Sequence, residues 1–343
     1  MRRRAFVACS LLAVLAPRAG YAAPADANSP LQLRFVTDEA DAVLRILDDR
    51  ATGTPSDADW QALFTSEGYR RLDARESSMR RPLDETSFRT FVMSDALLGR
   101  RAALRATLEA WSHADVTECG RRALAYLPAG SRMHATVYPE IKPAANSFVF
   151  DLEHDPGIFL YLNPDVTQMQ FTYTVSHELH HVGFAQNCPT PEVKRELDAL
   201  PERLKIFEDW LGAFGEGFAV LAGSGGPSVD PATVVGASAA PEWTTERATF
   251  APRMADLTTF LRGILSGKLT QDAARDTGMS FFGNQGPWYT VGWRMSVTIE
   301  QRFGRARLIA CIADNRLFLE TYNAAAGGSS LPLWPDDLAN AFG

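Results

Sequence analysis

Residues 176–183 read Ser-His-Glu-Leu-His-His-Val-Gly and contain the pattern His177-Glu178-x-x-His181. Residues four apart on an α-helix lie about 40° apart around the axis and one turn apart along it, so both imidazoles can reach one ion. Glu178 is turned about 100° from His177, so its carboxylate can reach water at that ion without binding the metal. The pattern predicts a zinc-binding helix over residues 168–186 that carries its own general base.

A catalytic zinc ion usually takes three protein ligands and leaves one position for water. One common solution is a third histidine six residues after His181, with a glycine at the third position. Asn187 and Phe184 occupy those places. The sequence therefore excludes this arrangement, and we expect the third ligand on a later helix.

Glu216 is the candidate that we favour for the third ligand. Small residues flank it at Gly212, Ala213 and Ala219, which form one face of a predicted helix. Glycine costs roughly 1 kcal/mol inside a helix relative to alanine, so such a face indicates close packing of two helices. The rival acidic residues, which have no such face, are Glu208, Glu196 and Asp198.

At this point the chain resembles the gluzincins, peptidases with a His-Glu-x-x-His motif and a downstream glutamate ligand. The segments 215–219 (Gly-Glu-Gly-Phe-Ala) and Tyr289-x-x-Gly292 resemble a bacterial family described as zinc-dependent peptidases. The resemblance covers roughly residues 145–325, although the Asn-Glu-x-x-x-Asp form of the glutamate helix is absent. It implies a zincin-like fold, with a small sheet above the metal-binding helix and a helical lower lobe.

The remaining pattern predicts an α+β protein that is predominantly helical. Short runs rich in β-branched and aromatic residues predict strands over 133–138, 147–152 and 158–162, the last two forming a hairpin at Asp155-Pro156-Gly157. We expect an upper lobe over 31–186 and a helical lower lobe over 187–343. Apolar periodicity predicts helices over 37–50, from 55, 86–111, 115–126, 191–200, 202–221, 242–266, 288–303 and 306–324.

The N-terminus has the layout of a secretory signal peptide over residues 1–23, followed by a flexible leader over 24–30. A basic start precedes a short apolar core and small residues, and a buried first helix is the alternative. Removal of residues 1–23 takes away four arginines, so the formal charge changes from −7 to −11. We therefore expect an exported protein, periplasmic or secreted, whose acidic character argues against nucleic acid as partner. After the N-terminus, no stretch is apolar and long enough to span a bilayer.

Three cysteines then remain, an odd number, so at most one internal disulfide is expected among Cys119, Cys188 and Cys311.

Two further side chains carry alternative interpretations. Tyr289 stands at the start of a predicted helix, where its phenol either stabilises an oxyanion or packs in the core. His180 is interpreted as a solvated surface residue, with a supporting role beside the metal ligands as the alternative.

These observations together predict an exported zinc hydrolase, in which His177, His181 and Glu216 hold Zn²⁺ and Glu178 and Tyr289 are catalytic. The expected substrate is a peptide or protein, bound as an added strand at the edge of the 147–162 sheet. One alternative is a non-catalytic binding protein of zincin shape. The other is a zinc hydrolase that acts on a non-peptide amide.

Overall fold

The computed structural model describes residues 29–237, 239–283 and 285–343. The predicted signal peptide, and all of the predicted leader before residue 29, lie outside the described residues. The chain divides into two compact units. The sheet unit comprises described residues up to 117 together with 133–171, and the helical unit comprises residues 118–132 and 172–343.

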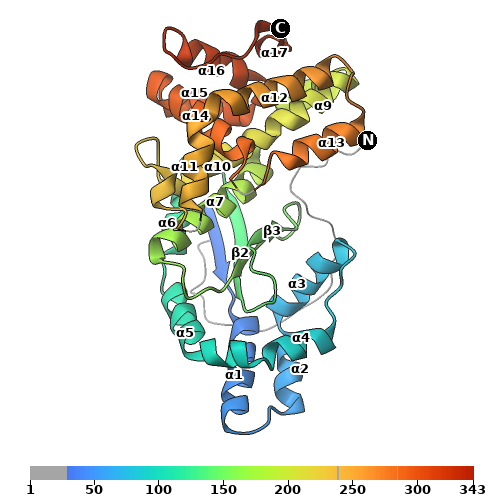
Figure 1. The fold of residues 1–343 in the computed structure, drawn as a ribbon, viewed down its shortest axis with the longest axis vertical. Coiled ribbons are helices and arrows are strands. Elements are labelled where there is room, and N and C mark those ends of the chain that lie inside the picture. Colours follow the sequence, from blue (N-terminus) through green and yellow to red (C-terminus); the bar gives the residue numbers. More distant parts are fainter. Residues whose placement is uncertain (1–28, 238, 284) are drawn as a thin grey trace. The chain divides into compact units, whose positions relative to one another are not determined.

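The sheet unit contains a four-stranded sheet in the order β1-β2-β4-β3. Strands β1 and β2 are parallel, with Leu31 opposite Met133, and β2 and β4 are also parallel. Strand β3 runs antiparallel to β4, with Phe148 opposite Phe159. Strands β2 and β3 are labelled in Figure 1. The strands are β1 (Leu31–Phe35), β2 (Met133–Glu140), β3 (Phe148–Phe150) and β4 (Gly157–Tyr161).

The three predicted strands and their hairpin are confirmed, whereas β1 was not predicted. Strand β1 has only five residues, which alternate between half-buried and exposed. A segment this short carries little periodic signal, and its pairing with β2 is what defines it as a strand.

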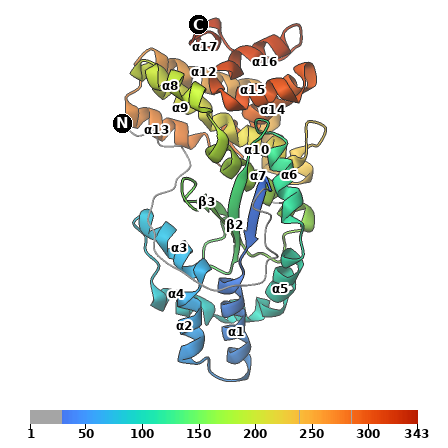
Figure 2. The ribbon, with the colours of Figure 1, turned by 180° about the vertical axis from the view of Figure 1, so that it is seen from behind.

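Helices of the sheet unit follow β1, and α1 packs against α2 and α5 (Figure 2). The predicted helix over 86–111 is wrong as a single element, because it is divided at Met93 and Ser94. The Ser94 hydroxyl accepts a hydrogen bond from the Leu97 N–H and so begins a new helix. The helices are α1 (Asp38–Thr52), α2 (Asp57–Thr65), α3 (Glu67–Ser78), α4 (Glu85–Val92) and α5 (Asp95–Ser112).

The helical unit contains the long helix α7 (Gln168–Asn187), continuous as predicted, which belongs to this unit from Thr172 onward. Among the helices of the described residues, none combines the length and apolar character needed to cross a bilayer. The other helices are α6 (Val116–Leu124), α8 (Pro191–Ala199), α9 (Glu202–Leu211), η1 (Gly212–Phe214), α10 (Gly215–Ser224), η2 (Pro231–Thr233), α11 (Ala240–Ala248), α12 (Phe250–Leu265), α13 (Gln271–Ser280), α14 (Pro287–Phe303), α15 (Arg305–Ala313), η3 (Asn315–Leu317), α16 (Phe318–Ala326) and α17 (Asp336–Ala339).

Three long helices predicted in this unit are each divided in the structure. The helix over 202–221 is interrupted by the 3-10 turn η1, between Gly212 and Gly215. The helix over 242–266 is divided at Thr249, and that over 306–324 at Asp314, whose backbone is extended. Apolar periodicity continues across such breaks, so it does not reveal them.

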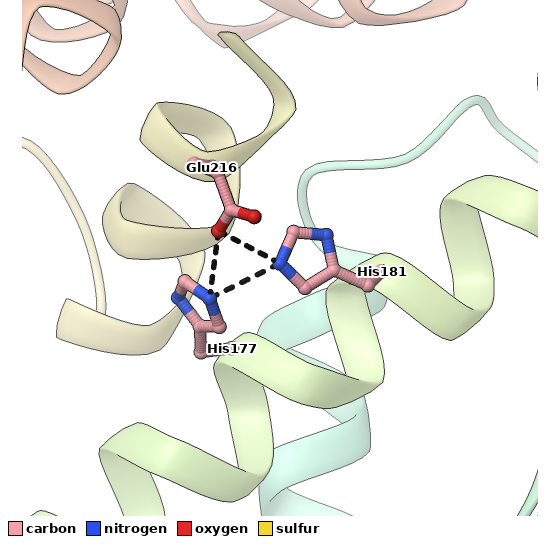
Figure 3. Close-up of side chains that lie close together, drawn as sticks. All are labelled: His177, His181 and Glu216. Atoms are coloured by element: carbon pink, nitrogen blue, oxygen red, sulfur yellow. Dashed lines mark hydrogen bonds and ion pairs between the residues drawn. The ribbon is translucent and has the colours of Figure 1, made fainter. Parts of the chain in front are cut away.

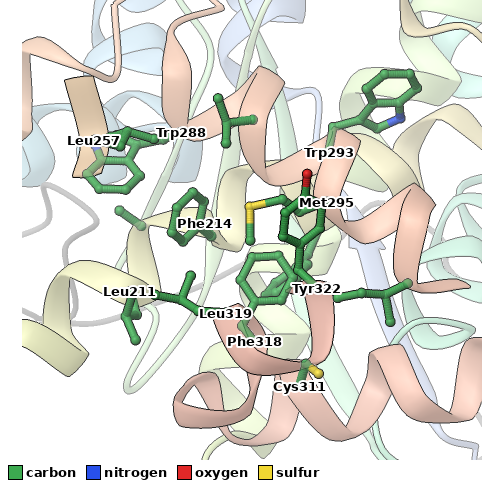
Figure 4. Packing of buried hydrophobic residues seen from close by; sticks show 14 of the residues in the cluster. Leu211, Phe214, Leu257, Trp288, Trp293, Met295, Cys311, Phe318, Leu319 and Tyr322 are labelled. Carbon is green, nitrogen blue, oxygen red and sulfur yellow. The ribbon is translucent and has the colours of Figure 1, made fainter. Parts of the chain in front are cut away.

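An aromatic core holds the helical unit together around Trp288, which is fully buried (Figure 4). Its ring stacks on Trp210, with centroids 6.1 Å apart, and meets Phe214 edge-on at 5.0 Å. These contacts join α14 to α9 and to η1.

Helices α10 and α14 approach each other closely at two glycines. A Cβ atom added to Gly217 would lie 2.2 Å from the backbone carbon of Gly292. Only a glycine permits this approach, which sets the relative positions of Glu216 on α10 and Tyr289 on α14.

Candidate metal centre

The two motif histidines lie one turn apart on α7 and face the same side. Their Nε2 atoms are 3.1 Å apart, with the rings nearly perpendicular. This is the arrangement that the four-residue spacing predicts, since it depends on local helix geometry alone.

Glu216 reaches the two histidines from α10 (Figure 3). Its Oε2 atom lies 3.1 Å from Nε2 of His181 and 3.3 Å from Nε2 of His177. The structure thus brings together the three predicted ligands, which form a group able to hold a metal ion. Of the rivals, Glu196 is paired with Arg316, and neither Glu208 nor Asp198 belongs to the group found among the described residues.

The spacing of the three atoms fits a zinc ion. Zinc lies about 2.0–2.2 Å from nitrogen and oxygen ligands, so ligands at tetrahedral positions are about 3.3–3.4 Å apart. The three observed separations, 3.1 to 3.3 Å, are close to this value. Within the described residues the group has three members, the number typical of catalytic zinc rather than of closed structural sites.

Glycine brings α10 close to the metal-binding helix, although at a different position from the one predicted. A Cβ on Gly223 would lie 2.9 Å from the Tyr173 carbonyl oxygen and 3.3 Å from the His177 Cβ. Gly212, part of the predicted small face, instead faces Asn315 at 3.6 Å. Gly212 and Ala213 lie in η1 and Ala219 lies in α10, so the predicted small residues do not share one continuous α-helix.

Glu216 and the histidines shift each other's pKa values. Burial would raise the pKa of Glu216, but His181 and His177 outweigh burial and lower it. Burial likewise would lower the pKa of His181, but the Glu216 carboxylate raises it to about 8. The Glu216 carboxylate and the His181 imidazole therefore favour each other's charged forms.

Glu178 lies one residue after His177 on α7. Burial raises the pKa of its carboxyl group, His177 and His181 lower it, and Glu216 raises it further, with a net upward shift. A carboxylate with a raised pKa accepts a proton more readily, as a general base must.

Two tyrosines flank His177. The ring of Tyr289, on α14, lies parallel to the imidazole, with centroids 6.2 Å apart. The ring of Tyr173, on α7 itself, lies 6.0 Å away and is tilted by 42°. Sequence reasoning missed Tyr173, although its position four residues before His177 places it on the same helix face.

The interpretation of His180 as a solvated residue is wrong. Its side chain is 1% exposed, and its pKa is lowered to about 3, by burial first and then by His181 and His177. Helix α7 is covered by protein on more sides than its sequence pattern indicated. His180 is therefore a buried neutral residue next to the centre.

The sequence allowed at most one disulfide among Cys119, Cys188 and Cys311, and within the described residues none of the three forms one.

A His-Glu-x-x-His helix whose histidines meet a glutamate of a second helix defines a candidate zinc centre of the peptidase class. The sequence model of a family described as "Putative zinc dependent peptidase (DUF5700)" matches residues 59–329. This is well over half of the chain, and the protein belongs to this family. The resemblance inferred from its residues is thereby confirmed. Neither a search of curated proteins nor a search of solved structures gives a match.

Proposed function

We propose that this protein is a zinc-dependent peptidase in which His177, His181 and Glu216 bind the metal. The observation that carries the proposal is the near-equilateral arrangement of their three ligand atoms, 3.1 to 3.3 Å apart. Membership of the family supports the same class of activity.

Zinc held there would lower the pKa of water to about 7 and polarise the scissile carbonyl. The Glu178 carboxylate accepts the proton of the attacking water and passes it to the leaving nitrogen. Tyr289, whose burial keeps its phenol protonated, donates a hydrogen bond to the oxygen that becomes negative.

The metal assignment is tested by elemental analysis of wild type, His177→Ala and Glu216→Ala. We expect about one zinc per wild-type chain and a large loss in both variants, because catalytic zinc needs three protein ligands. Glu196→Gln is the control: it alters a carboxylate paired with Arg316 and should retain zinc. If Glu216→Ala retained zinc, Glu216 would not be the third ligand and another residue would hold that position.

The role of Glu178 is tested with Glu178→Gln, which keeps the shape of the side chain but removes the base. We expect zinc to be retained and turnover of a peptide library to fall by about 100-fold or more. Undiminished hydrolysis would exclude Glu178 as the base. If the zinc-loaded wild type cleaved non-peptide amides but no peptide, the protein would be a zinc hydrolase of non-peptide amides. One that only binds peptides would favour a binding protein.

We further propose that the protein is exported. The support is the signal-peptide pattern of residues 1–23 and the acidic chain that its removal would leave. Cell fractionation with N-terminal sequencing tests this: we expect a start between residues 23 and 26 outside the cytoplasm. A cytoplasmic protein that retains Met1 would refute export.

A further inference from the structure

Tyr173 lies beside the candidate metal centre, although it is not part of the His-Glu-x-x-His motif. It lies one turn before His177 on α7, on the face that carries both histidines. Its ring is 6.0 Å from that of His177. Gly223 of α10 packs against its backbone, so α10 and α7 hold it in place together.

The hydroxyl of Tyr173 makes no hydrogen bond with any described residue, although the residue is only 9% exposed. Unlike the unpartnered side-chain atoms that are fully buried among the described residues, this hydroxyl is accessible to solvent. By contrast, Tyr138 donates to Glu67 at 2.7 Å and Tyr322 donates to the Pro332 carbonyl at 2.9 Å. A mostly buried tyrosine normally finds such a partner, so a free hydroxyl here indicates a donor kept for a ligand.

The surroundings of Tyr173 keep it a donor. Burial raises the pKa of its phenol, and the carboxylates of Glu216 and Glu178 raise it further. The raised pKa favours the protonated phenol, and the group lies within electrostatic range of both carboxylates of the centre.

Tyr289, the other phenol beside His177, shares these surroundings. Burial raises the pKa of its phenol, and Glu216, Glu178 and Tyr173 raise it further.

We propose that Tyr173 is a second substrate-binding phenol of the centre, donating a hydrogen bond to the substrate oxygen on which negative charge develops. This role rests on the proposed function. No proton is transferred from Tyr173, because the phenol donates a hydrogen bond throughout.

The test is Tyr173→Phe, which keeps the ring beside His177 and removes only the hydroxyl. Three measurements are made on zinc-loaded protein: the zinc content, the steady-state kinetics (kcat and KM) for the best library peptide, and calorimetric binding (Kd) of a matching peptide phosphonamidate. The phosphonamidate carries a tetrahedral, negatively charged group where the scissile amide stands. The matched control is Tyr322→Phe, which removes a buried phenol elsewhere in the helical unit.

We expect Tyr173→Phe to retain zinc, to lower kcat by about 10- to 100-fold with little change in KM, and to weaken phosphonamidate binding similarly. The control should match wild type in all three. Wild-type kcat and phosphonamidate affinity in Tyr173→Phe would overturn the proposal while leaving the proposed function intact. Loss of zinc would also overturn it, since Tyr173 would then only brace His177. A wild type that binds neither zinc nor phosphonamidate would overturn both.

Discussion

Replacing Gly217 by alanine should disturb the metal centre through a new methyl group that meets α14 and not the ligand side chains. The new Cβ would lie 2.2 Å from the Gly292 carbonyl carbon and from the Trp293 nitrogen, both backbone atoms. Ordinary contacts begin near 3.4 Å, so α10 and α14 must move apart by about 1.2 Å. No side-chain rotation can relieve this contact.

The displacement would reach the ligands because Glu216 is the neighbour of Gly217 on α10. Metal–ligand distances tolerate deviations of about 0.2 Å, several times less than the required movement. We expect Gly217→Ala to lose about 1–3 kcal/mol in the free energy of unfolding and at least about 10-fold in zinc affinity. Urea denaturation measures the first quantity, and competition with a chromophoric chelator measures the second.

Gly215→Ala is the matched control on the other side of Glu216. Among the described residues, no atom lies within 4 Å of a Cβ built there. The helix gains up to about 1 kcal/mol from alanine, so this variant should be as stable as wild type or more so, with unchanged zinc affinity. Equal behaviour of the two variants would refute the reasoning, because the contact with Gly292 could then not be as close as the structure has it.

Three further predictions concern the rest of the molecule. Burial raises the pKa of Glu39 to about 8, so wild type should lose stability as pH rises from about 4.5 to 8, where the unfolded chain ionises first. Glu39→Gln keeps an acceptor for the Ile141 N–H, 2.9 Å away. At pH 8.5 the free energy of unfolding of this variant, measured by urea denaturation, should exceed that of wild type by at least about 1.4 kcal/mol, whereas at pH 4.5 it should not. Equal denaturation curves at both pH values would contradict this. Gly278→Ala would place a Cβ 2.1 Å from the Trp210 ring and should cost about 1–3 kcal/mol in the same measurement, whereas an unchanged midpoint would mean that the ring can move aside. Alkylation of the denatured, unreduced protein followed by mass spectrometry should label all three of Cys119, Cys188 and Cys311, and a protected pair would reveal a disulfide.

Much of the candidate centre could be predicted because helix periodicity is a local property. The spacing of His177 and His181 already places their imidazoles on one face, and α7 is continuous as expected. The small residues around Glu216 indicated close packing of its helix and led to the third ligand. The β-branched runs likewise predicted β2, β3 and β4.

Other features depended on contacts between residues far apart in sequence. Strand β1 is defined by pairing with β2, a hundred residues later, and the breaks near Ser94 and Asp314 depend on single capping side chains. Local periodicity is the same on both sides of such breaks, so it did not reveal them.

The sequence alone thus identified the candidate residues of the centre: two histidines and the proposed base on one helix, and a glutamate on another. Only the tertiary structure decided that Gly223 meets the metal-binding helix, that Gly217 meets Gly292, and that Tyr173 has a free hydroxyl beside His177. The reason is that the crossing point of two helices depends on the packing of both, and neither segment encodes it separately.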